Sequence, residues 1–82
     1  MKFEELYVGA RIVADASHLK NRWPPIWVVE KLHAHDFPQS VDIRLVSNGA
    51  VTGGAQPGYC VHNQPFQDWW LFSRNPDDPH GR

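Results

Sequence analysis

Residues 41–46 alternate apolar and polar side chains, and this stretch constrains the fold more than any other part of the sequence. The apolar positions 41, 43 and 45 share one face of an extended chain, which predicts a β-strand with one buried side. Asn48-Gly49 follows and suits the left-handed dihedral angles of a two-residue type I′ turn. We therefore expect an antiparallel hairpin whose return strand begins at Val51 and Thr52.

Further short apolar runs, separated by proline and glycine turns, occupy most of the chain. Strands are predicted over residues 8–15, 26–34, 59–63 and 68–73. A leader containing Phe3, Leu6 and Tyr7 can cover one end of the core, and residues 15–25 form a long loop that closes on Pro24-Pro25. Short strands at this spacing predict an all-β fold, a small antiparallel barrel of about five strands.

The chain of 82 residues is sufficient for a single domain, which we place at residues 1–73. Residues 74–82 hold two prolines, a glycine and no apolar side chain, so a disordered tail is expected. Cys60 is the only cysteine, which excludes an intrachain disulfide and favours a reducing compartment. The first residues lack the basic patch and apolar run of a signal peptide, and no stretch approaches membrane-spanning length, so the expected location is the cytoplasm.

The net charge of the chain limits which kinds of partner are expected. The formal net charge is −1, with acidic and basic residues scattered along the chain. Such a chain has no long-range field that attracts phosphate backbones and no acidic face that mimics DNA. Non-specific nucleic-acid binding is therefore disfavoured, and no membrane partner is expected.

The order of these segments, together with the stretch Asp-Trp-Trp-Leu-Phe-Ser-Arg at 68–74, resembles SH3-like small barrels. The resemblance implies a barrel of about five strands. In SH3 domains proper, the first tryptophan of the corresponding element faces solvent and packs on proline-rich ligands. The resemblance assigns that position to Trp69.

The two adjacent tryptophans should differ in environment, because neighbouring side chains of a strand point to opposite faces. We expect Trp70 and Phe72 in the core and Trp69 near a surface groove. The alternative is that both indoles are covered by the leader and by the 15–25 loop.

A second aromatic element surrounds the rigid Pro24-Pro25 pair. Arg22 and Trp23 precede it, and a fixed loop bearing an aromatic side chain loses little entropy on docking. The predicted binding residues are Trp23, Trp69, Tyr59 and Arg22. In the alternative interpretation, Trp23 caps the end of the barrel.

A zinc site is the main cofactor alternative. His33 and His35 are two residues apart, as are Cys60 and His62, so each pair shares a face of an extended segment and four ligands could converge. Isolated histidines on strands are more commonly surface or hydrogen-bonded residues, and we predict no metal and no cofactor.

Cys60 is also the one candidate nucleophile, with His62 as its base and Asp36 or Asp68 as the orienting group. A cysteine between Tyr59 and Val61 in a strand is more simply a small buried residue. We therefore expect that the protein is not an enzyme.

These observations favour a non-enzymatic protein-binding module, or a small accessory or inhibitory protein of the kind that phages and mobile elements encode, acting through an exposed aromatic surface. One alternative is a single-stranded nucleic-acid-binding barrel, which requires a basic track next to the tryptophans. The candidate cations for that track are Arg11, Arg22, Lys31 and Arg44. Another alternative is a structural subunit that self-associates.

Overall fold

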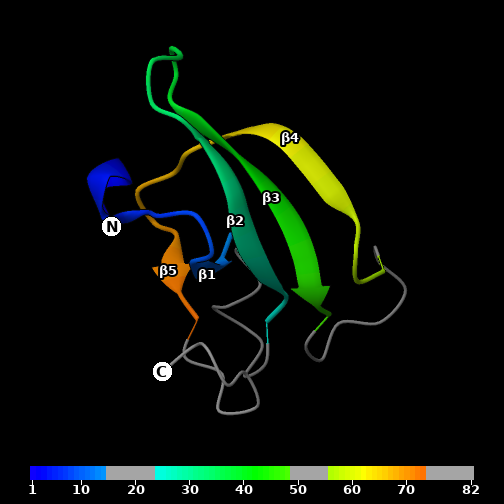
Figure 1. The fold of residues 1–82 in the computed structure, drawn as a ribbon. Coiled ribbons are helices and arrows are strands. Elements are labelled where there is room, and N and C mark those ends of the chain that lie inside the picture. Colours follow the sequence, from blue (N-terminus) through cyan, green and yellow to red (C-terminus); the bar gives the residue numbers. More distant parts are fainter. Residues whose placement is uncertain (15–23, 49–55, 74–82) are drawn as a thin grey trace.

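The computed structural model describes residues 1–14, 24–48 and 56–73 of the chain. These residues form one short helix and five strands (Figure 1). The elements are η1 (Phe3–Glu5), β1 (Arg11–Val13), β2 (Ile26–His33), β3 (Ser40–Ser47), β4 (Cys60–Pro65) and β5 (Leu71–Phe72). The all-β prediction is confirmed.

The five strands form a single antiparallel sheet in the order β4-β3-β2-β1-β5. The last strand therefore returns beside the first, and β1 pairs with both β2 and β5. The expected closed barrel is not formed by the described residues, because β4 and β5 are the two edges and do not pair with each other. Closure needs edge strands long enough to meet, whereas β5 has two residues and spans only about 7 Å at the usual rise per residue.

The β2–β3 pair is the longest part of the sheet, with eight residues in each strand. Its register places Ile43 opposite Val29 and is shifted at two points along the pair. Val41, Ile43 and Leu45 are buried, as the alternation of residues 41–46 predicts. This face of the sheet carries the core.

Trp70 is the largest fully buried side chain. Its ring packs edge-on against Phe66, with ring centroids 5.4 Å apart, and Phe66 packs edge-on against Phe3 at 5.5 Å. Phe3 and Leu6 of the leader are buried in the same cluster. The expected burial of Trp70 is confirmed, but the prediction that Tyr7 covers the core is wrong, since that side chain is exposed.

The strand that contains the paired tryptophans is shorter than predicted. Asp68 and Trp69 lie in a turn, in which the Trp70 backbone N–H donates to the Gln67 carbonyl at 3.2 Å. The strand itself is limited to Leu71–Phe72. The different burial of the two indoles therefore arises at a turn, and not from the alternation of a continuous strand.

The other boundaries differ by a few residues from those expected. The predicted strand over 8–15 is limited to Arg11–Val13, because residues 7–10 form a turn in which the Ala10 N–H donates to the Tyr7 carbonyl and Gly9 has a φ of 95°. The return strand at 51–52, most of the 15–25 loop and the tail at 74–82 lie outside the described residues. Within the described ranges, no helix has the length and apolar character needed to cross a membrane.

Candidate functional site

An exposed apolar surface forms where the leader meets β5. The Met1 ammonium group donates to the Asp68 carbonyl at 2.6 Å, which holds the start of the chain against the turn before β5. Tyr7 stacks on Phe72, with ring centroids 6.2 Å apart and an interplanar angle of 27°. Tyr7 and Leu71 are both exposed. Phe72, which was expected in the core, is half-buried and packs against it, whereas its strand neighbour Leu71 points to the other face of β5. We call Met1, Tyr7 and Phe72 the leader–β5 surface.

A shallow hollow of about 190 Å³ belongs to this surface. It is lined by Met1, Trp70, Leu71 and Phe72. Because Trp70 is fully buried, it supplies a rigid base beneath more exposed neighbours. The arrangement presents apolar contact area on a fixed frame, which limits the entropy lost on binding a partner.

Trp69 flanks this surface, two residues before Leu71 along the chain. Its side chain is 40% exposed, whereas that of Trp70 is fully buried. The expected solvent-facing position of Trp69 therefore agrees with its placement in the turn. Its role in binding stays a prediction.

Tyr59, the second predicted binding residue that the structure describes, lies elsewhere. It is exposed and immediately precedes β4, where its carbonyl accepts a hydrogen bond from the Leu45 N–H at 2.8 Å. Since β4 and β5 are opposite edges of the sheet, Tyr59 and Trp69 flank different edges. Arg22 and Trp23 lie outside the described residues.

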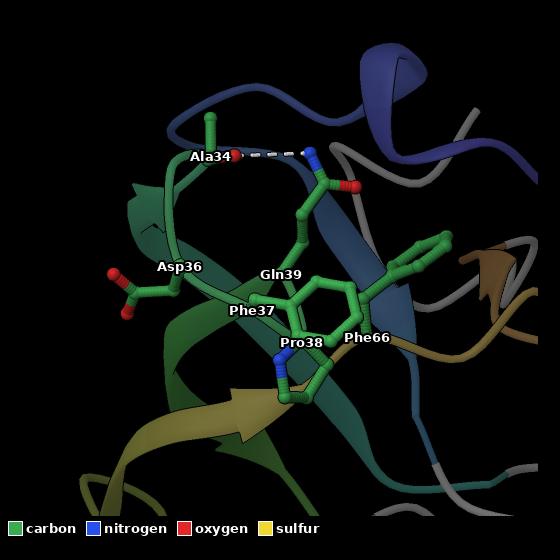
Figure 2. A pocket seen from close by; sticks show the side chains of 6 residues that line it. All are labelled: Ala34, Asp36, Phe37, Pro38, Gln39 and Phe66. Carbon is green, nitrogen blue, oxygen red and sulfur yellow. Dashed lines mark hydrogen bonds between the residues drawn. The ribbon is translucent and has the colours of Figure 1, made fainter.

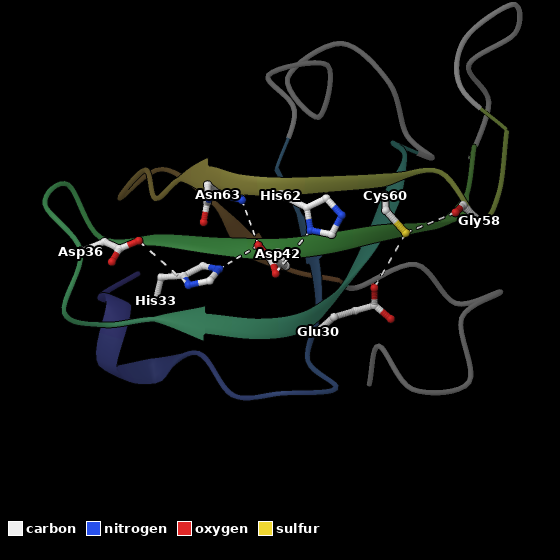
Figure 3. Close-up of polar contacts among 8 residues, drawn as sticks. All are labelled: Glu30, His33, Asp36, Asp42, Gly58, Cys60, His62 and Asn63. Carbon is white, nitrogen blue, oxygen red and sulfur yellow. Dashed lines mark hydrogen bonds and ion pairs between the residues drawn. The ribbon is translucent and has the colours of Figure 1, made fainter.

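The outer face of β2, β3 and β4 is polar (Figure 3). The Arg44 Nε donates to Glu30 Oε2 at 3.1 Å. Cys60 lies directly opposite Arg44 in the register and is exposed, so the prediction of a buried cysteine is wrong. The physical reason is the pairing, which places the thiol on the same outer face as Arg44, with Sγ 3.9 Å from Glu30 Oε1 and 3.5 Å from the Gly58 carbonyl.

Asp42 is the centre of a second polar group on this face. Its carboxylate accepts hydrogen bonds from His33 Nε2 at 2.8 Å and from the Asn63 backbone N–H at 2.9 Å, and His62 Nδ1 lies 3.4 Å away. The Asn63 N–H, followed by His33, lowers the pKa of Asp42 from 3.8 to about 2. Asn63 reaches the carboxylate with a left-handed backbone, at a φ of 57°.

The zinc site considered as an alternative, from His33, His35, Cys60 and His62, is not formed by these side chains. His33 and His62 both turn toward Asp42, while Cys60 contacts Glu30 (Figure 3). In residues 1–14, 24–48 and 56–73, no group of three or more histidine, cysteine, aspartate or glutamate side chains is placed to hold a metal ion.

The surroundings of His62, the base considered for a Cys60 nucleophile, also differ from those expected. Asp42, and not Asp36 or Asp68, is the carboxylate beside His62. Asp36 instead lies 4.0 Å from His33 Nδ1.

The candidate basic track is interrupted in the part of the chain that the structure describes. The register aligns Arg11, Val28 and Arg44 across three strands. Arg44 is paired with Glu30, however, and Lys31 lies opposite Asp42. Cations therefore alternate with carboxylates, which weakens attraction to a phosphate backbone.

Three residues of interest were not identified from the sequence: Tyr7, Phe37 and Asp42. The position of Asp42 between His33 and His62 depends on the register of three strands, and the exposure of Tyr7 depends on where the leader ends. For Phe37 alone the sequence held a usable signal, because it is an apolar side chain within the polar turn at 35–40.

In comparisons with known proteins, no family model, no curated protein and no solved structure matches the chain.

Proposed function

We propose that the chain is a non-enzymatic protein-binding module and that its partner contacts the leader–β5 surface together with Trp69. The observation that carries this proposal is the contact between two segments that are distant in sequence: exposed Tyr7 of the leader stacks on half-buried Phe72 of β5. Contiguous exposed apolar area of this kind is typical of interaction sites, whereas single exposed apolar residues are common everywhere.

The exposed side chains of this surface gain free energy when a partner covers them. Covering a large apolar or aromatic side chain stabilises a complex by roughly 1.5 to 3 kcal/mol relative to leaving it in water. Tyr7 is 59% exposed, so covering it yields part of that gain, and Trp69 adds the residue type most enriched among binding hot spots. The alternating charges on the outer face of the sheet favour a protein partner over a phosphate backbone.

We also propose that the sheet is an open variant of the SH3-like arrangement. The support is the strand order, in which β1 lies between β2 and β5, so that the first and last strands are neighbours. In this arrangement the turn at Asp68 and Trp69 is held next to the leader by the Met1 contact.

The test is recovery of partners from a lysate of the source cells, using untagged protein coupled to a resin. A Tyr7→Ser/Trp69→Ala variant should lose protein bands that the wild type captures. Tyr59→Ser is the matched control, because Tyr59 is 55% exposed and Tyr7 is 59% exposed, but Tyr59 flanks the other edge of the sheet. All three proteins are first compared by their amide NMR spectra to establish that they are folded.

The outcomes separate the function classes. Bands lost only with the Tyr7/Trp69 variant support the proposal and give the partner for direct affinity measurement. A folded variant that retains every partner contradicts it. Capture that disappears after nuclease treatment would instead favour the single-stranded nucleic-acid alternative.

A further inference from the structure

The turn between β2 and β3 is a well-defined projection from the sheet. The Asp36 N–H donates to the His33 carbonyl at 3.3 Å, and the Gln39 side-chain amide donates to the Ala34 carbonyl at 3.1 Å (Figure 2). The Phe66 N–H in turn donates to the Gln39 carbonyl at 3.0 Å, which ties the end of β4 to the base of the turn. The tip therefore has a defined shape.

Phe37 is at this tip and is fully exposed, at 102% of its reference area. No other large hydrophobic side chain of the described residues exceeds about two thirds exposure. A phenyl ring held entirely in water is unfavourable for an isolated domain, because burial of aromatic area is a main source of stability.

An open hollow of about 490 Å³ lies directly beside this ring (Figure 2). It is lined by Ala34, Asp36, Phe37, Pro38, Gln39 and Phe66. The Asp36 carboxylate extends away from both phenyl rings, so the remaining walls are apolar or uncharged. The volume of the hollow lies within the range of roughly 300 to 1,000 Å³ that small-molecule pockets occupy, which is large enough for a phenyl side chain.

We propose that this tip, the Phe37 knob and its adjoining hollow, docks against the same tip of a second copy of the chain. The surface carries both halves of the contact, and self-complementarity is what a two-fold interface requires. Each phenyl ring would enter the hollow of the other copy. The resulting order, Phe66, the partner's Phe37, Phe37, the partner's Phe66, is unchanged by a 180° rotation.

The surface area buried between the two copies limits the strength of this association. Two aromatic side chains bury about 150 to 250 Å² each, which is far below the roughly 1,200 Å² of stable complexes. The dimer is therefore weak and forms at high protein concentration. The tip shares no residue with the leader–β5 surface, so this inference is independent of the proposed function.

The experiment is a dilution series of amide NMR spectra from about 1 mM to about 0.05 mM, with sedimentation velocity on the same samples, since weak complexes dissociate in this range. In wild type, signals of residues 34–39 and of Phe66 should move with concentration. Phe37→Ser should remove this dependence, with at least about a tenfold rise in the dissociation constant. Tyr59→Ser, which removes an exposed aromatic outside the tip, should behave as wild type.

A second variant tests the hollow while keeping the knob. Ala34→Arg places a long charged side chain at an exposed wall position and leaves Phe37 in place. It should also abolish the concentration dependence. The proposal is overturned if the wild-type spectrum does not change with concentration, if the moving signals lie outside the tip, or if either folded variant associates as wild type does.

Discussion

The Asp42 carboxylate of β3 lies 2.8 Å from Nε2 of His33 on the adjacent strand β2. A carboxylate can only accept in this contact, so the imidazole N–H donates. His62 on β4 approaches the same carboxylate at 3.4 Å, which makes Asp42 a link among three neighbouring strands on the outer face.

This link predicts an acid-dependent loss of stability. Because the pKa of Asp42 is about 2 in the folded protein and 3.8 without its partners, the unfolded state binds more protons between these values. The contribution of Asp42 is complete above about pH 5 and should decline as the pH falls through about 4 to below about 2. Urea unfolding at several pH values should show a shallower dependence in this window for Asp42→Asn than for wild type. Asp36→Asn is the control carboxylate, and an equal effect of both substitutions would contradict the assignment.

The two histidines beside Asp42 should contribute unequally to the free energy of unfolding. The His33 side chain is 18% exposed and makes the shorter contact, whereas that of His62 is 74% exposed. We expect His33→Ala to cost about 1 to 2 kcal/mol and His62→Ala less than about 0.5 kcal/mol, since exposed ion pairs contribute little. Urea denaturation of both variants at neutral pH measures the difference. Equal costs would show that the half-buried geometry of His33 is unimportant.

Substitution of the adjacent tryptophans should separate core packing from surface contact. Trp70→Ala leaves a cavity among Phe3, Phe66 and their neighbours and should cost about 3 to 5 kcal/mol. Trp69→Ala should cost less than about 1.5 kcal/mol, because that side chain is 40% exposed. Thermal and urea unfolding provide the comparison. A larger cost for Trp69→Ala would reverse their assignment.

Cys60 should react with a thiol reagent in the native protein. Its exposed position on the outer face gives access without unfolding. We expect one equivalent of a chromogenic disulfide to react at a rate that 6 M urea raises by less than about tenfold, since burial and not folding as such protects thiols. Cys60→Ser is the blank for the assay. A thiol that reacts only in urea would be buried, as the sequence alone suggested.

The sequence predicted elements best where side-chain alternation was unambiguous. Residues 41–46 form part of β3 with the expected face buried. The segment at 68–73 was harder because its four central side chains, at 69–72, are all apolar and show no alternation, and the contact between Met1 and Asp68 at its turn is one that no local pattern reveals.

The candidate site was predictable in part for the same reason. The exposure of Trp69 agrees with the sequence-based expectation, but the face that Cys60 occupies depends on its pairing with Arg44. Alternation within the 59–63 segment is compatible with either face. Tyr7 joins the surface only because the chain returns to place β5 beside β1.

The left-handed backbone of Asn63 has a consequence for how molecules of this protein can add to one another. β4 is the longer of the two edge strands, and a straight edge of six residues is a template for another strand. Asn63 interrupts the regular spacing of main-chain donors and acceptors along β4, and its own N–H is directed to Asp42. An incoming strand therefore meets an irregular template, so continuous main-chain pairing of a second molecule along the whole of β4 is disfavoured.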